Sequence, residues 1–302
     1  MLSSIFSSRS AGAPSSRWIA EVALCAIGLL AAYAAAIQLW LPPVDVGQSQ
    51  GASNRIKIER YLYRGDAPAE GVIIGSSLSA RLPPEALGSG LANLALGGDS
   101  ALTGLEIVAR HPPFPKILLV EINVLQKPAN HPLVASALAP VPAKIRELLP
   151  AARVQYQPIN ILYWALHRVV HGRRGVVDTV IPEETHRTLL ALQDANYRQT
   201  PDAADLSANL EQLRILVRSL ETKGVTVVFF ELPVDPSLVN LPLATVIRHH
   251  VQTIFPVSQY CWIDWPIDGG FRNTDGVHLI ETSAYNVAAT FEARLNACSK
   301  GK

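Results

Sequence analysis

The stretch Gly71–Leu82, GVIIGSSLSARL, joins a short apolar run to a glycine, two serines and the start of a helical pattern. An apolar run without alternation is typical of a strand that is buried on both faces. A serine just beyond such a strand, at the mouth of a helix, is exposed and lies beside backbone N–H groups that have no helical partner. This position suits a nucleophile whose attack creates an oxyanion.

Strand-like and helix-like patterns alternate along most of the chain after this corner. Further apolar runs cover residues 91–96, 116–123, 224–231 and 260–264. Apolar residues recur at three- and four-residue spacing in 101–110, 206–223, 243–254 and 282–296. This alternation predicts an α/β fold, a doubly wound parallel sheet with right-handed crossovers. Function in such folds gathers at the carboxyl ends of the strands.

Residues 126–205 interrupt the alternation, because they contain helical stretches and prolines but no convincing strand. An insertion of about 80 residues in a compact domain is usually a lid, a cap or a partner surface. We therefore expect a helical insertion.

The composition places the chain among folded proteins and gives no sign of polyanion binding. The 302 residues are 49% hydrophobic and 17% charged, with a formal net charge of +1. That is enough apolar material for a sizeable core. Since neither a global positive field nor a nucleic-acid motif is present, we expect no nucleic-acid partner.

Residues 18–40 form the most apolar segment, and their only charged residue is Glu21. The segment is long enough to cross a bilayer as a helix. Arg9 and Arg17 precede it, and no basic residue follows until Arg55, so the N-terminus is expected in the cytoplasm. A cleaved signal peptide is the alternative, because Ala32-Tyr33-Ala34 resembles a cleavage site.

The expected organisation is therefore a cytoplasmic tail (1–17), a transmembrane anchor (18–41), a linker (42–70) and the α/β domain (71–302). Cys261 and Cys298 are the only cysteines in the exported part. They form either one disulfide or two buried thiols, and the sequence leaves both open.

Asp275 and His278 stand three residues apart, in a loop before the last helical pattern. A neutral histidine can accept a serine proton, and a nearby carboxylate can fix its tautomer. Ser77 after the first strand and Asp275-x-x-His278 before the last helix are therefore the candidate catalytic residues.

In these residues the chain resembles the SGNH or GDSL hydrolases, whose four sequence blocks appear in the family's order. The first block is Gly75-Ser-Ser77-Leu, with Ser76 in place of the usual aspartate. The second resembles Asn93–Ser100. The third keeps Asn123 but has Glu121 and Val124 at its glycine and aspartate positions. The fourth, Asp275–His278, is intact.

The resemblance implies a flavodoxin-like three-layer fold and acyl-ester chemistry without a metal or organic cofactor. Ser77 would be the nucleophile, His278 the base and Asp275 the residue that orients it. The N–H groups of Ser77 and Gly98 and the side chain of Asn123 would form the oxyanion hole. Ser100 lies in a second GDS-like sequence, but the block order makes it a helix N-cap instead.

Relatives of this kind that are anchored in the membrane modify envelope glycans. The resemblance thus implies an esterase or O-acyltransferase on the outer side of a bacterial inner membrane, acting on an acylated polysaccharide. A multispanning protein that passes acyl groups is an expected partner. The alternative is a non-catalytic scaffold that keeps the fold and binds a partner in a polysaccharide synthesis or secretion complex.

Overall fold

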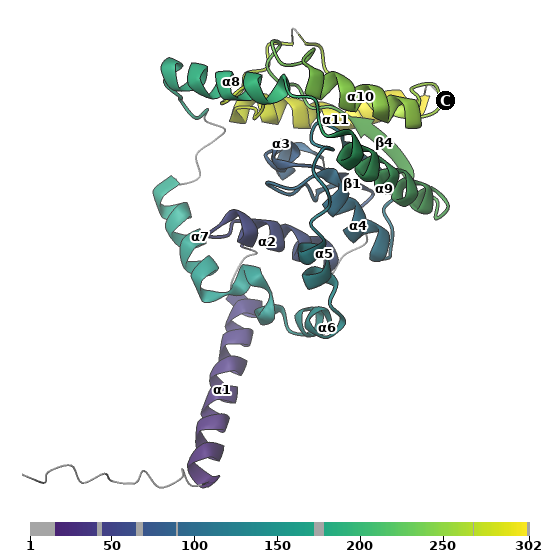
Figure 1. Ribbon diagram of the computed structural model, residues 1–302. Helices are drawn as coiled ribbons and strands as arrows, with labels where there is room; N and C mark the ends of the chain where they lie inside the picture. Colours follow the sequence, from purple (N-terminus) through teal and green to yellow (C-terminus); the bar gives the residue numbers. More distant parts are fainter. Residues whose placement is uncertain are drawn as a thin grey trace, which may run out of the picture.

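The computed structural model describes residues 16–40, 44–64, 69–88, 90–171, 178–267 and 269–300 (Figure 1). Most of the expected cytoplasmic tail, residues 1–15, lies outside the described residues.

One five-stranded parallel sheet forms the centre of the fold. Its strands are β1 (Gly71–Ile74), β2 (Leu91–Asn93), β3 (Ile117–Glu121), β4 (Thr226–Phe230) and β5 (Cys261–Ile263). They are ordered β2-β1-β3-β4-β5, and every neighbouring pair is parallel. All five strands fall within the apolar runs of the sequence, so the predicted α/β fold is confirmed.

Helices cover both faces of the sheet, because successive strand residues point to opposite sides. Val72, Leu118 and Phe229 face one cluster, which includes residues of α4 (Ala101–Arg110), α9 (Ala203–Glu221) and α10 (Pro242–Ile254). Ile73, Leu119 and Phe230 face the other cluster, which includes residues of α3 (Ser77–Ala80) and α11 (Glu281–Lys300). The three-layer arrangement follows from these two cores.

Helix α2 (Gln50–Leu62) differs from the linker that we expected over residues 42–70. Ser49 caps it by accepting a hydrogen bond from the Ala52 N–H, and Ile58 and Leu62 are buried in the core. Its buried side also carries the polar residues Asn54 and Glu59. These polar residues obscure the apolar spacing by which such a helix is recognised.

The described residues of the insertion between β3 and β4 form helices joined by loops and contain no strand; residues 172–177 lie outside them. The insertion contains α5 (His131–Leu138), α6 (Pro140–Leu148), α7 (Pro158–His171) and α8 (Glu183–Tyr197). Two short 3-10 helices, η2 (Pro150–Ala152) and η3 (Val154–Tyr156), join α6 to α7. Another 3-10 helix, η1 (Pro84–Ala86), precedes β2.

Helix α1 (Ser16–Trp40) is long and apolar enough to cross a membrane, and it projects away from the domain (Figure 1). Only its Ile37 is buried. By length and composition it is either a membrane anchor or a signal sequence.

A disulfide joins Cys261 in β5 to Cys298 in α11, with their Cα atoms 5.7 Å apart. It therefore ties the edge strand of the sheet to the last helix. Disulfides persist in oxidising compartments. Together with the apolar helix α1, this disulfide indicates an extracytoplasmic or membrane location.

Removing the disulfide should destabilise the domain. Cys298→Ser frees a loop with a sequence separation of 37 in the unfolded chain. We expect a loss of about 2–4 kcal/mol in unfolding free energy, because the unfolded state gains conformational entropy. Urea unfolding of the full chain in detergent measures this loss. Cys25→Ser, which removes an exposed thiol in α1, is the control. Equal stability of the two variants would contradict the prediction.

Candidate active site

Ser77 stands at the corner between β1 and α3, where it is the first residue of the helix. Its backbone N–H has no partner within the helix, because the first N–H groups of a helix point outward. The preceding Ser76 is the N-cap, and its Oγ accepts a hydrogen bond from the Leu78 N–H at 3.2 Å. Ser76 therefore shapes the turn and Ser77 is presented beyond it.

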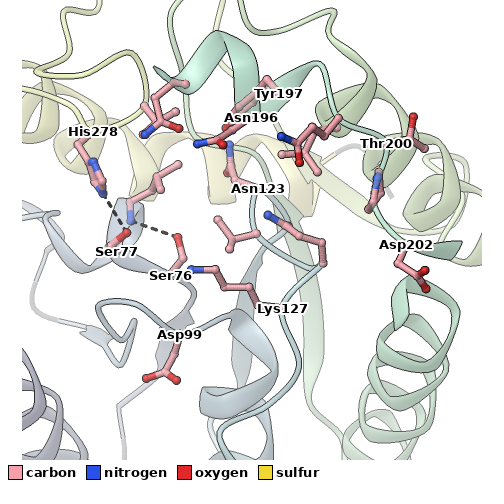
Figure 2. A pocket seen from close by; sticks show the side chains of 18 residues that line it. Ser76, Ser77, Asp99, Asn123, Lys127, Asn196, Tyr197, Thr200, Asp202 and His278 are labelled. Carbon is pink, nitrogen blue, oxygen red and sulfur yellow. Dashed lines mark hydrogen bonds between the residues drawn. The ribbon is translucent and has the colours of Figure 1, made fainter. Parts of the chain in front are cut away.

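Ser77, His278 and Asp275 form one connected group. Figure 2 shows its first contact, between Ser77 and His278. Ser77 Oγ lies 2.9 Å from His278 Nε2, although the residues are 201 positions apart. His278 Nδ1 lies 2.7 Å from Asp275 Oδ2 on its other side. An imidazole that donates Nδ1–H to a carboxylate leaves Nε2 as an acceptor for the serine proton. The structure thus brings together the three residues that we predicted as catalytic.

The loop that carries His278 and Asp275 is fixed by backbone contacts on both sides of the pair. The Thr274 N–H donates to the His278 carbonyl at 2.7 Å, and the Ile280 N–H donates to the Arg272 carbonyl at 3.0 Å. Gly276 turns the chain with φ +96°, a conformation that side chains with a Cβ disfavour. The imidazole is therefore positioned by its own turn.

Asp275 is held in its charged form. Burial opposes that charge, but hydrogen bonds from the side chain and backbone of His278 outweigh it and lower the pKa of Asp275 to about 2. The backbone N–H of His278 donates to Oδ1 at 2.8 Å, so both carboxylate oxygens bind His278. The carboxylate is thus a permanent anchor for the imidazole at ordinary pH.

The three groups expected in the oxyanion hole differ in how they are placed. Asn123 lines the same cavity as Ser77. Its Nδ2 donates to the Leu232 carbonyl and its Oδ1 accepts from the Leu232 N–H, which leaves one Nδ2 hydrogen for another acceptor. Gly98 is exposed, with φ +79°, and is not among the residues that line the cavity, although the adjacent Asp99 is. Its role in the oxyanion hole stays a prediction.

Glu121 is the residue whose contribution the sequence motifs did not indicate. It ends β3, is 1% exposed, and accepts hydrogen bonds from the backbone N–H groups of Ser76 and Ser79 at 3.0 and 3.1 Å. The hydroxyls of both serines also donate to it. Gly75 is required beside it, because a Cβ there would collide with the Glu121 side chain. One buried carboxylate thus holds the turn on which Ser77 stands.

Burial raises the pKa of the Glu121 carboxyl, although the hydrogen bonds from Ser76 and Ser79 favour its charged form. A carboxylate at this strand end departs from the third block of the SGNH pattern. Ser76, which stands at the aspartate position of the first block, is the partner of this carboxylate. Its Oγ donates a hydrogen bond to Glu121 Oε1 at 2.6 Å. The two residues that depart from the SGNH pattern, Ser76 and Glu121, are therefore hydrogen-bonded to each other.

Helix α2 braces the two loops at the base of the site. Lys57 Nζ donates to the carbonyls of Ala80 and Ala95, one after the nucleophile corner and one after β2. Burial, with a smaller contribution from Arg60, lowers the pKa of Lys57 to about 8. The Asn54 side chain pairs with both the N–H and the carbonyl of Gly97. The segment expected as a linker therefore supports the site directly.

A cavity of about 510 Å³ opens above Ser77 and His278. Its far wall comes from the end of α8, with Asn196 and Tyr197, and from the loop that leads to α9, with Thr200 and Asp202 (Figure 2). Gln126 and Lys127 contribute from the loop after β3. The sequence predicts a lid, a cap or a partner surface for this insertion, but no sequence pattern indicates which of its residues face the serine.

Ser100 lies apart from this group, at the N-cap position of α4. It is fully buried and makes no side-chain capping bond; its Oγ instead contacts the Pro128 carbonyl at 3.5 Å. The expected cap position is thus confirmed, while the expected capping bond is not formed. Within the described residues, no group of three His, Cys, Asp or Glu is arranged to hold a metal ion.

Glu121→Ala should cost more stability than the matched change Glu106→Ala. Both glutamates are buried, but Glu106 is bound by Arg110, His131 and the partly exposed Gln212, whose side chains can turn to water. Loss of Glu121 strands two buried N–H groups and two buried hydroxyls, and we expect roughly 3 kcal/mol or more. Urea unfolding of both variants measures the difference. A smaller loss for Glu121→Ala would refute the role of this carboxylate.

Asp275 should make stability depend on pH in acid. Its folded-state pKa of about 2 lies below its ordinary value of 3.8, so its contribution is present above pH 3.8 and lost as pH falls through 2. The difference in unfolding free energy between the parent and Asp275→Asn is therefore expected to shrink between those limits. Unfolding at a series of pH values measures it. A difference that is constant across this range would contradict the assignment.

Comparison with known proteins leaves the fold and the geometry as the basis for function. No protein-family model matches the chain, and no curated protein matches it. What the chain shows is an α/β fold with a five-stranded parallel sheet and an N-terminal apolar helix. Since one fold hosts many activities, function has to be argued from the site.

Proposed function

We propose that this chain is an SGNH-type serine acyl-esterase or O-acyltransferase that acts on an extracytoplasmic polysaccharide. The observation that carries the proposal is the line of contacts from Ser77 Oγ to His278 Nε2 and from His278 Nδ1 to Asp275, at 2.9 and 2.7 Å. These distances are within hydrogen-bond reach, as nucleophile activation requires.

In the proposed reaction, Ser77 Oγ attacks the carbonyl carbon of an ester while its proton passes to His278 Nε2. The tetrahedral intermediate expels the alcohol, which takes the proton from His278, and an acyl-Ser77 remains. Water or an acceptor hydroxyl then attacks the acyl group, again losing its proton to His278. The second tetrahedral intermediate then expels Ser77 Oγ, which takes this proton back from His278, and the product is an acid or a new ester. Hydrolysis and transfer thus share every residue and differ only in the second nucleophile.

The N–H of Ser77 and the remaining hydrogen of Asn123 Nδ2 are the proposed oxyanion donors, with the N–H of Gly98 as the third. Donors of this kind stabilise charge that develops only in the transition state. Asn123 is kept in place by its two bonds to the backbone of Leu232.

The polar wall of the cavity supports a substrate rich in hydroxyl groups. Gln126 Oε1 is buried and accepts no hydrogen bond from the residues that the structure describes. Asn196, Gln199 and Thr200 add both donors and acceptors. Sugar hydroxyls supply the complementary donors and acceptors. An O-acylated glycan therefore fits this wall better than an apolar ester does.

Helix α1 and the disulfide support a location on the outer side of a bacterial inner membrane, with the N-terminus in the cytoplasm. In this arrangement α1 spans the bilayer once, and a multispanning protein that passes acyl groups across it is the proposed partner. Tethering suits a substrate that is made or modified at the membrane.

Ser77→Ala should abolish both esterase activity and labelling by a serine-directed fluorophosphonate. Without the hydroxyl no acyl-enzyme forms, so hydrolysis of an aryl acetate by the purified full chain should fall about 10³-fold or more. Adding an oligosaccharide to the parent reaction distinguishes the two outcomes of the second step. Acylated sugar, detected by mass spectrometry, indicates transfer, and free acid alone indicates hydrolysis.

Ser100→Ala is the matched control, because Ser100 belongs to the second GDS-like sequence but lies outside the cavity. This variant should keep both the labelling and the activity. If the folded parent chain neither reacts with the probe nor hydrolyses the ester, the enzymatic proposal fails, and a scaffold with the same fold takes its place.

A further inference from the structure

Helix α6 turns an apolar face toward solvent. Val141, Ile145 and Leu148 are 70%, 50% and 71% exposed, and Leu149, directly after the helix, is 44% exposed. Their spacing of four, three and one residues places them on one side of a helix. We call these four residues the α6 patch. Contiguous exposed apolar groups of this kind mark an interaction surface.

An ion pair between Arg146 and Glu59 holds the opposite side of α6 against the domain. Arg146 Nε lies 3.3 Å from Glu59 Oε1, and both side chains are largely buried. Glu59 also accepts a hydrogen bond from the Val154 N–H at 2.7 Å. Arg153 Nε donates to the Arg146 carbonyl at 2.9 Å. The helix therefore cannot turn its apolar face inward without breaking a buried ion pair, which is strongly unfavourable.

Helix α6, which carries the patch, lies at the side of the domain where α1 joins it (Figure 1). Leu149 is followed directly by η2, and η2 contacts both α6 and α1. Near that contact the Tyr33 hydroxyl donates to the Tyr156 carbonyl, and Ile37 is 2% exposed. The last two turns of α1, η2 and α6 are thus joined in one packed unit.

The length of α1 determines how far the packed unit of α1, η2 and α6 lies from the centre of a bilayer that α1 spans. Its 25 residues extend about 37 Å at 1.5 Å per residue. A bilayer core of about 30 Å takes up roughly 20 of them. If the span begins at the N-terminal end of α1, the residues that contact η2 and η3 lie at the outer boundary of the core. The α6 patch is therefore at the depth of the lipid headgroups.

We propose that the α6 patch inserts into the outer boundary of the same bilayer that α1 spans, and that it holds the domain in a fixed orientation. The occupant of the patch is the layer between lipid headgroups and acyl chains, where amphipathic helices bury their apolar faces by about 5–10 Å. The proposal rests on α1 being an uncleaved anchor, and it does not depend on the acyl chemistry. Two contacts with the membrane, one spanning and one interfacial, prevent the domain from tilting freely about α1.

Fluorescence quenching in lipid nanodiscs tests the proposal with the full chain. An environment-sensitive dye is attached to Leu148→Cys in a Cys25→Ser background, so that no other free thiol among the described residues reacts. Val257→Cys is the matched control, because Val257 is an apolar residue of similar exposure (63%, against 71% for Leu148) in the loop between α10 and β5. Leu29→Cys, 73% exposed within α1, reports the anchor itself. Spin-labelled lipids with the quencher near the headgroup or deep in the acyl chains give the depth.

The dye at position 148 should emit at shorter wavelength than the dye at 257. The shallow label should also quench the dye at position 148 at least about twofold more than the dye at position 257, because position 148 lies at the interface. The dye at position 29 should be quenched by the deep label. If position 29 is quenched and position 148 behaves like 257, the patch does not contact lipid, and a protein partner becomes its occupant. If position 29 is not quenched, the anchor and this inference both fail, while the result for Ser77→Ala is unaffected.

Discussion

The buried carboxylate of Glu121 is the contact on which the geometry of the site depends. It receives the N–H groups and hydroxyls of Ser76 and Ser79, which lie on either side of the nucleophile in the same turn. A group with four donors and almost no exposure is costly to disturb, since each stranded donor would lose a bond that water cannot replace. Ser77 is the residue in this turn whose hydroxyl remains directed at the imidazole. The corner is thus rigid on the sheet side and reactive on the cavity side.

Helix α2, the first element after the apolar helix α1, also supports the site. Lys57 and Asn54 of α2 reach the loops after α3 and after β2, and Glu59 of the same helix receives Arg146 from α6. One short helix therefore contacts the nucleophile corner, the Gly97–Gly98 loop and the helix that we propose to lie in the membrane interface. If α1 spans a bilayer as proposed, the position of the candidate site relative to that bilayer would be set by contacts along this helix.

The sheet and its covering helices could be predicted because their residues follow simple periodicities. The apolar runs in 116–123 and 224–231 are short, which favours a strand buried on both faces over a buried helix. The order of Ser77, Asp275 and His278 along the chain was also sufficient to predict that they would meet. The role of Glu121 could not be predicted, because in the sequence it is only a departure from the motif. Its function in holding the turn becomes clear from the hydrogen bonds that Ser76 and Ser79 donate to it. Helix α2 was missed because polar residues lie on its buried side. The cavity wall formed by α8 and the loop before α9 could not be predicted, because it depends on how the insertion packs against the sheet domain.

The short connection between α1 and α2 has a consequence for how such a protein would work. Ile37 near the end of α1 and Val44 before α2 are both buried in the domain, and the Gln48 N–H donates to Asn160 Oδ1. If α1 is the proposed anchor, these contacts on both sides of residues 41–43 would give Ser77 a constant height above the lipid surface. For the proposed acyl chemistry, reach is then supplied by the polymer: a glycan strand has to be fed past a stationary centre. Acylation would be confined to the stretch of strand that emerges within that narrow zone, and its pattern would be set by the rate of delivery.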